Sequence, residues 1–301
     1  MKIFVFGQGK VGRPLALAWR RAGHTVIARA ARKGWPARPI DADAVLLAVR
    51  DGDLGGLCER ALRERTLPAR AVVFHAAGSK SAEVLAALRP VVRGVAQFHP
   101  MISFADPQRP PQWRGGHVHV AGDPAAVRVG RTLARALGMV PRTFGADFDA
   151  VGYHAAAGLT ANGAAALAAL AAKILEGAGV PAKDVPALLG PLLRSVGDNV
   201  EALGFPHALT GPVRRGDAAG VQKHDALLEA RLPEVVPLYR AATRAQLPLA
   251  EALAEAPPAA FAALRTLIAS WTKLPKPAAN EPTGARAGGG RSERKNPPRK
   301  R

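Results

Sequence analysis

The sequence predicts an α/β protein in which an N-terminal Rossmann-type domain with a parallel sheet precedes an all-α C-terminal domain. A short buried strand at residues 2–6 runs directly into the glycine-rich turn Gly7–Gly12. Strand-like runs then alternate with helical segments as far as residue 120, which is typical of parallel sheets with helical crossovers. Beyond about residue 148, Ala- and Leu-rich segments separated by prolines replace the strand-like runs.

The N-terminal elements follow one another closely. We expect a helix over 14–22, a stop at Gly23 and a second strand over 25–28. A strand, a glycine turn, a helix and a second strand within about thirty residues form the context in which a glycine pattern predicts a dinucleotide site. The remaining elements expected in this domain are strands at 44–49, 71–74, 95–98 and 117–120, a helix at 54–65, and a short helix before the strand at 95–98.

A chain of 301 residues is long enough for two domains. We place the boundary near residues 145–148, with a nucleotide-binding domain over 1–147 and a helical substrate or dimerisation domain over 148–272. The tail 273–301 holds nine Lys or Arg and two Glu, together with many Pro and Gly. Because it has almost nothing to bury, we predict that it is disordered.

The net charge of +19 allows nucleic acid, an anionic membrane or an anionic small ligand as partner. Arginine is abundant throughout the chain, so a solvated basic surface explains most of this charge and nucleic acid is the less favoured partner. The single cysteine, Cys58, excludes an intramolecular disulfide.

An uncharged stretch over 155–172 is mostly alanine and is too weakly apolar for a good membrane span. We therefore expect a buried core helix there, and no membrane partner. The chain enters a strand at once and shows no signal peptide, so we expect a cytoplasmic protein.

Each glycine of the turn has a physical role in holding a dinucleotide. Gly7 permits the tight turn, Gly9 lets the backbone approach the pyrophosphate, and Gly12 lets the helix pack close to the strand. The start of the following helix offers amides and a positive dipole end to the phosphates. The expected cofactor contacts on this turn are Gly7, Gln8, Gly9, Lys10, Val11 and Gly12.

The end of the second strand favours NADP over NAD. NAD enzymes usually carry an acidic residue about twenty positions past the glycines, which binds the ribose 2′-hydroxyl. Here the strand ends with Arg29, Arg32 and Lys33 and no acid. Arginine can hold a 2′-phosphate with two hydrogen bonds, although either side chain could instead point into solvent. Ala48, Val49 and Arg50 end another strand, where ligands of open sheets bind, and complete the expected cofactor site. The exit loops His75–Ser79 and His99–Ser103 of neighbouring strands are the expected walls on the nicotinamide side.

Several segments together resemble a known superfamily. The turn Gly7–Gly12, Gly23-His24 and Ala44–Val49 resemble the pyrroline-5-carboxylate reductases and β-hydroxyacid dehydrogenases. Within it, three segments resemble a branch that joins a Rossmann-like domain to a C-terminal helical domain of unknown function: Phe98–Phe104, Tyr153–Ala156 and Leu209–Asp217. The resemblance covers roughly residues 1–270. It implies an NADP-binding oxidoreductase that is a homodimer through its helical domain.

One departure from the superfamily bears on the chemistry. The resemblance implies a catalytic lysine four residues before an asparagine on the first interdomain helix. Asn162 fits that asparagine, but position 158 is glycine. Hydroxyacid chemistry by the usual route is therefore in doubt, whereas reduction of an already protonated imine needs no such base.

A polar stripe is expected on the helix that follows the domain boundary. His154, Gly158 and Asn162 recur every four residues and share a face, as a cleft wall requires. Tight helix packing around a satisfied histidine is the competing interpretation. His99, held by Pro100 at a strand exit, is a further candidate acid or base.

A second set of candidates lies in the specific stretch 209–217. We expect a helix to begin at Thr210-Gly211-Pro212, with Thr210 as its cap. Arg214 is a candidate clamp for a carboxylate or phosphate and could instead pair with Asp217. His224 follows on the same face as a candidate acid or base.

The leading hypothesis is an NADP-dependent oxidoreductase acting on a small, anionic substrate of imine or keto/hydroxy acid type. An NADP-binding sensor or scaffold without turnover is the alternative, favoured by the missing lysine. Association with nucleic acid through the basic tail is a third hypothesis. No metal-ligand spacing is present in the sequence.

Overall fold

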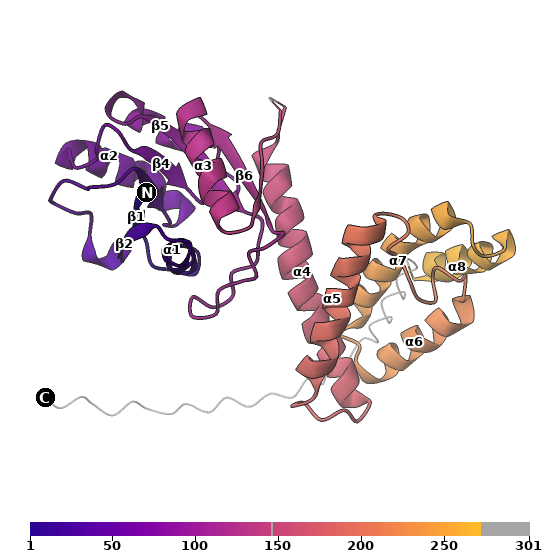
Figure 1. Cartoon of the computed structure of the whole chain (residues 1–301). Helices are drawn as coiled ribbons and strands as arrows, with labels where there is room; N and C mark the ends of the chain where they lie inside the picture. The colour runs from indigo at the N-terminus through magenta and orange to yellow at the C-terminus, as the bar shows by residue number, and fades with distance from the viewer. Residues whose placement is uncertain (146, 272–301) are drawn as a thin grey trace, which may run out of the picture. The chain divides into compact units, whose positions relative to one another are not determined.

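The computed structural model describes residues 1–145 and 147–271, so the tail predicted over 273–301 lies outside the described residues. The chain forms two compact units, residues 1–169 and residues from Leu170 onward. Figure 1 shows the strand-containing part in indigo to magenta and the later helices in orange to yellow. The predicted α/β class, with a Rossmann-like sheet followed by helices, is confirmed.

The first unit is built on a seven-stranded sheet of order β2-β1-β3-β4-β5-β6-β7. All neighbouring strands are parallel except β5 and β6, which are antiparallel. The strands are β1 (Lys2–Phe6), β2 (Thr25–Arg29), β3 (Ala44–Leu47), β4 (Val72–His75), β5 (Gly94–Pro100), β6 (His117–Gly122) and β7 (Val140–Arg142). Between them lie α1 (Gly12–Arg21), η1 (Ala31–Lys33), η2 (Asp51–Asp53), α2 (Leu54–Glu64), η3 (Ala82–Val91) and α3 (Pro124–Ala136).

Two apolar cores cover the faces of this sheet because successive strand residues point to opposite sides. Ile3 and Val5 of β1 pack on the side that includes Trp19 of α1 and Leu133 of α3. The indole nitrogen of Trp19 donates a hydrogen bond to the carbonyl oxygen of Leu133 (3.2 Å), which ties α1 to α3. The intervening residues of β1, Phe4 and Phe6, pack on the other side with Trp35 and with side chains of α2 and η3.

The sequence missed two features of the sheet. The reversal at β6 was not expected, and neither was β7, which has three residues and contains Pro141. A strand so short carries no readable alternation of apolar residues. The helix expected before β5 is the 3-10 segment η3, with Pro90 inside it. Strand β3 ends at Leu47, before the predicted Val49.

Over its described residues, 170–271, the second unit has helices as its only regular secondary structure. They are the end of α4 (Ala150–Gly177), α5 (Val185–Leu203), α6 (Ala218–Arg231), α7 (Val236–Leu253) and α8 (Pro258–Ser270). Val221, Ala250 and Leu264 form one small core between α6, α7 and α8. Ile174 of α4 packs against a second core around Leu228 and Val236.

The prediction that a helix begins at Thr210-Gly211-Pro212 is wrong. These residues form turns, and α6 begins only at Ala218. Gly211 and Gly216 adopt positive φ angles of 93° and 71°, which break a helical run. The N-cap is Asp217, whose carboxylate accepts a hydrogen bond from the backbone N–H of Gly220 (2.8 Å).

The buried core helix predicted over 155–172 is also wrong in one respect. The segment is helical, within α4, but α4 contains no buried residue. It is long and apolar enough to cross a membrane by length and composition. Leu159 is 79% exposed and Val151 is 65% exposed. An uncharged, apolar helix sequence predicts that something other than water covers the helix. It does not identify whether the rest of the chain, another chain or a membrane does so.

Candidate active site

The glycine turn between β1 and α1 is closely packed on one side and open on the other. Gly7 has φ of 107°, and a Cβ there would lie 2.7 Å from the carbonyl carbon of Ala48. A Cβ at Gly12 would lie 2.9 Å from the Cβ of Ala48. At Gly9 the same added atom would meet nothing within 4 Å. Two glycines thus bring the turn against β3, and the third leaves free space at its outer side.

Hydrogen bonds hold this turn to the neighbouring strand. The backbone N–H of Gly7 donates to the carbonyl oxygen of Arg29 (2.8 Å). The side-chain amide of Gln8 donates to the carbonyl oxygen of Ala28 (2.7 Å). The turn and the end of β2 therefore form one rigid edge.

A cavity of about 620 Å³ opens along this edge. It is lined by 18 residues: Gly7–Val11, Ala30–Arg32, Ala48–Asp51, Asp53, Ala76–Gly78, His99 and His154. All of them belong to the first unit. Eleven of the predicted site residues line the cavity: five on the turn, Arg32, three after β3 and the two histidines. The cavity lies at the carboxyl ends of the strands, where open α/β sheets bind ligands.

Two predicted cofactor residues do not line this cavity, Gly12 and Arg29. The Arg29 guanidinium instead donates to the carbonyl oxygens of Gly34 (2.7 Å) and Lys33 (2.6 Å), which closes the turn η1. Arg32 lies on that turn and reaches the cavity wall. A spacing argument could not separate the two arginines, because the difference arises from the 3-10 turn that follows β2.

His99 and His154 meet over Gly78 at one end of this cavity. Their ring centroids are 5.8 Å apart at an interplanar angle of 76°. A Cβ added to Gly78 would lie 2.7 Å from Cε1 of His99 and 2.9 Å from Cε1 of His154. The loop after β4 was predicted to border the site, but Gly78 was not singled out within it. Only a residue without a side chain fits beneath the two rings.

The hydrogen bond of His99 determines which of its nitrogens carries a proton. Nδ1 of His99 lies 3.0 Å from the carbonyl oxygen of Ala76, which can only accept. Nδ1 therefore carries the hydrogen, and Nε2 of the neutral ring is an acceptor. Burial lowers the pKa of His99 below its ordinary value, and so does the neighbouring His154.

Two buried polar side chains support the loop beneath the histidines. The amide of Gln97 donates to the carbonyl oxygens of Ala77 (2.7 Å) and Gly78 (3.2 Å). Nε2 of His75 lies 3.1 Å from the carbonyl oxygen of Ser81 and donates to it. Burial lowers the pKa of His75 to about 4, so this ring stays neutral. The hydrogen bonds of Gln97 and His75 thereby fix the loop that follows β4 and carries Gly78.

A second cavity of about 450 Å³ shares His99 and His154 with the first. Asn162 and Gly158 of α4 line it, as the predicted polar stripe requires. The other side is the loop after β5, including Met101 and Phe104. The two histidines therefore stand where the cavities meet.

An aromatic cluster lies behind this pair. His119 packs against Phe148 (4.3 Å between centroids) and Tyr153 (5.9 Å), and Tyr153 contacts His99 (5.8 Å). Burial lowers the pKa of His119 to about 4. In the register of the sheet His119 stands opposite His99. The alternation of the run 117–120 indicated a strand and carried no sign of this pairing.

The other two predicted catalytic residues lie in the second unit. The Arg214 guanidinium pairs with both carboxylate oxygens of Glu255 (2.6 and 2.7 Å) and donates to the carbonyl oxygen of Leu209. It does not pair with Asp217. His224 lies 3.2 Å from the hydroxyl of Tyr239. Arg214 thus serves the packing of its own unit, and neither residue lines the two cavities.

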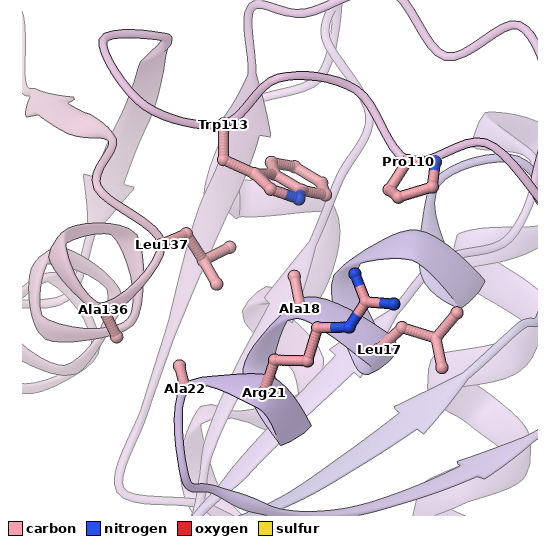
Figure 2. A pocket seen from close by; sticks show the side chains of 8 residues that line it. All are labelled: Leu17, Ala18, Arg21, Ala22, Pro110, Trp113, Ala136 and Leu137. Atoms are coloured by element: carbon pink, nitrogen blue, oxygen red, sulfur yellow. The ribbon is translucent and has the colours of Figure 1, made fainter.

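A third cavity, of about 250 Å³, lies at the opposite end of α1 (Figure 2). Its lining is apolar, with Trp113, Leu17 and Leu137, apart from the guanidinium of Arg21. It contains neither a histidine nor a carboxylate. Within the described ranges 1–145 and 147–271, no group of three or more His, Cys, Asp or Glu side chains could hold a metal ion.

Comparison with known proteins places this geometry in context. A family model described as a domain of unknown function (DUF2520) matches residues 117–246. The match begins at β6 and ends within α7. No curated protein is significantly similar to the chain in sequence.

Several solved structures share the fold across most of the chain. A proposed NADP oxidoreductase from Bacteroides fragilis is 22% identical, with a TM-score of 0.62, over 82% of this chain and 97% of its own. A protein from Thermotoga maritima is 20% identical (TM-score 0.60; 84% and 100% covered). An imine reductase from Streptomyces aurantiacus is 20% identical (TM-score 0.53; 89% and 99% covered).

These matches agree with the resemblance seen in the sequence. At such identities the solved structures establish the fold, and the family model marks residues 117–246 as similar to one described family. The chain has the fold of these solved structures, a Rossmann-like sheet followed by helices, and its residues 117–246 match the model of the DUF2520 family.

Proposed function

We propose that the protein is an NADP-dependent oxidoreductase that transfers hydride to or from a small substrate of imine or keto/hydroxy acid type. One observation carries this proposal: a single cavity runs from the glycine turn, past Arg32, to His99 and His154. The nicotinamide supplies the hydride chemistry, while the protein supplies orientation and electrostatics. Solved structures of the same fold include an imine reductase and a proposed NADP oxidoreductase.

The lining residues fit an anionic dinucleotide. Gly9 leaves free space at the start of α1, where a helix N-terminus favours phosphate. Lys10, Arg32 and Arg50 bring three positive charges to the cavity, against Asp51 and Asp53. Arg32 follows β2, at the position where a 2′-phosphate distinguishes NADP from NAD.

His99 is the candidate acid–base group. Because its Nδ1–H is committed to the carbonyl oxygen of Ala76, Nε2 is available to accept a hydrogen bond. In the oxidative direction this nitrogen takes the proton of a hydroxyl or amine, and in the reductive direction it returns that proton. His154 borders both cavities beside it and orients the reacting group.

The test is turnover of NADPH by the full chain against a panel of imines, ketones and aldehydes, with product identified by mass spectrometry. With NADPH deuterated at the transferred position, we expect deuterium in the product. His99→Asn should lower kcat by about 100-fold or more while leaving NADPH binding unchanged. His207→Asn, an exposed histidine of the second unit, is the matched control. Turnover that is equal in the two variants would remove His99 from the mechanism.

A sensor or scaffold is the second candidate function. The observation that favours it is Gly158, which stands in the second cavity where the resemblance implies a catalytic lysine. This function predicts NADPH binding together with no turnover across the whole panel. Under this function His99→Asn has no effect on turnover, because the wild type has no turnover either.

We further propose a cytoplasmic homodimer in which a second copy covers α4 and α5. Along α5 the side chains of Leu188, Leu192, Val196, Val200 and Leu203 recur at helical spacing and are 37–60% exposed. A bilayer is a poor alternative cover, because α5 also carries Arg194, Asp198 and Glu201. On α4, His154 and Asn162 line a cavity against the sheet, which a membrane-spanning helix could not do.

Leu192→Glu tests the homodimer, because it places a charge in the apolar stripe of α5. We expect the wild type to sediment as a dimer and Leu192→Glu as a monomer. Arg194→Ala, on the same helix and off the stripe, should remain dimeric. A wild-type chain that is monomeric at micromolar concentration would contradict the proposal.

A further inference from the structure

The two cavities that meet at His99 and His154 differ in charge. The first contains Lys10, Arg32 and Arg50. Among the described residues that line the second cavity there is no Lys, Arg, Asp or Glu. Its polar groups are the two imidazoles, the hydroxyls of Ser103 and Thr160, and the amide of Asn162. Anion-binding charge is thus concentrated on the nucleotide side.

A carboxylate in the second cavity would find no Lys or Arg among the described lining residues. Burying an ionised carboxylate without such a partner is strongly unfavourable, and proteins that recognise carboxylates usually do so with Arg or Lys. The imidazole of His99 is not a permanent cation, its Nδ1–H already donates to Ala76, and burial lowers its pKa below the ordinary value. Arg214, the carboxylate clamp expected from the sequence, is held by Glu255 in the second unit.

The shape and walls of the cavity suit an uncharged molecule with an apolar body. Its volume of about 450 Å³ lies within the range of small-molecule sites. Met101, Ile102 and Phe104 line one side, and Ala157 and Ala161 of α4 line the other. The polar groups can hydrogen-bond a C=O or C=N group without any formal charge.

We propose that the second cavity selects an uncharged ketone or imine with an apolar substituent and rejects the analogue that carries a carboxylate in its place. This inference rests on the proposed function and narrows it, since the sequence alone favoured an anionic substrate. In the reductive direction NADPH loses a hydride, with its two electrons, to the carbon of the C=O or C=N group. The oxygen or nitrogen takes one proton, which comes from solvent by way of Nε2 of His99, and the products are NADP⁺ and an alcohol or amine.

Matched substrate pairs test the selection, each differing only by a methyl group in place of a carboxylate. One pair is 2-methyl-1-pyrroline and 1-pyrroline-2-carboxylate, and the other is 4-methylcyclohexanone and 4-oxocyclohexanecarboxylate. We expect kcat/KM to be at least about 30-fold higher for the methyl member of a pair than for the carboxylate member, which corresponds to about 2 kcal/mol of discrimination. Equal or higher kcat/KM for the carboxylate member would overturn the inference.

Binding to the NADP⁺-loaded full chain, followed by ligand-observed NMR, separates this inference from the proposed function. If no pair is turned over but the methyl member binds more tightly, hydride transfer fails and the selection stands. If the carboxylate member binds more tightly, or if neither member binds, the selection is overturned. A change of lining adds a positive test: Ser103→Arg should shift the preference at least about tenfold toward the carboxylate member. Ala105→Arg, in the same loop and outside the lining, should not shift it.

Discussion

Gly78 lies directly beneath the imidazole of His154, so closely that a Cβ at Gly78 would stand 2.9 Å from Cε1 of that ring. His99 approaches the same point, with its Cε1 at 2.7 Å. The backbone of the loop after β4 therefore sets the spacing of the two histidines. Gly78 is thus a positioning residue that influences hydride transfer by placing these two rings.

This relationship predicts that Gly78→Ala displaces one or both imidazoles. We expect kcat to fall by about 10- to 100-fold, as small misplacements of catalytic groups do, while NADPH binding changes little. Gly55→Ala, a helical position with nothing within 4 Å of the added atom, is the matched control. Full activity of Gly78→Ala with the fold intact would show that the spacing of the histidines is unimportant.

Gly9 should behave differently from the other glycines of the turn. Because an added Cβ meets nothing, Gly9→Ala should leave the melting temperature unchanged and weaken NADPH binding by intruding on the ligand's space. Gly12→Ala should lower the melting temperature, since its Cβ would press on Ala48. Thermal unfolding with and without NADPH measures both effects. Unchanged NADPH affinity in Gly9→Ala would contradict the placement of the pyrophosphate.

Substitutions of the two arginines should have different effects. Loss of Arg32 should change the choice of cofactor, and loss of Arg29 should change stability. Arg32→Gln should raise the Kd for NADPH roughly 10- to 100-fold, the loss of one charge-assisted contact, and leave the Kd for NADH nearly unchanged. Arg38→Gln, an exposed arginine outside the cavity, is its control. Arg29→Gln should instead destabilise the turn η1, because two hydrogen bonds to backbone carbonyls are lost. Equal effects of Arg32→Gln on both cofactors would remove Arg32 from the 2′-phosphate site.

The buried histidines predict a loss of stability in mild acid. His75 and His119 each have a pKa lowered from 6.5 to about 4, chiefly by burial. Below pH 6.5 the unfolded chain takes up protons that the folded chain does not, so the free energy of unfolding falls until about pH 4 and then levels off. The full effect of His75 is on the order of 3 kcal/mol.

Urea unfolding between pH 7.5 and 4 measures this dependence. His75→Gln keeps a donor for the carbonyl oxygen of Ser81 and removes the titrating ring, so its unfolding free energy should fall less steeply over this range. His207→Gln, at an exposed position, should match the wild type. A slope that is the same in His75→Gln as in the wild type would mean that His75 takes up its proton at the same pH in the folded and the unfolded chain.

The parts of the fold that were predictable are those in which a local pattern dictates a local structure. The glycines of the turn, the alternation of strands and helices, and the stripe of His154, Gly158 and Asn162 are of this kind, and the structure brings that stripe to a cavity. The loop His75–Ser79 was expected at the nicotinamide side, but the contact of Gly78 with the two histidines was not, because it depends on strands that become neighbours only in the sheet. Arg29 and Arg32 look equivalent in sequence, and only the turn η1 separates them. The charge of a cavity, likewise, depends on which side chains reach it.

The most direct test of the account is an equilibrium titration of the full chain with NADPH and, separately, with NADH, followed by nicotinamide fluorescence. The account predicts saturable binding of NADPH, with a Kd at least about tenfold lower than for NADH, and loss of this difference in Arg32→Gln. No binding of NADPH at millimolar concentration would contradict the assignment of the cavity that joins the glycine turn to His99 and His154.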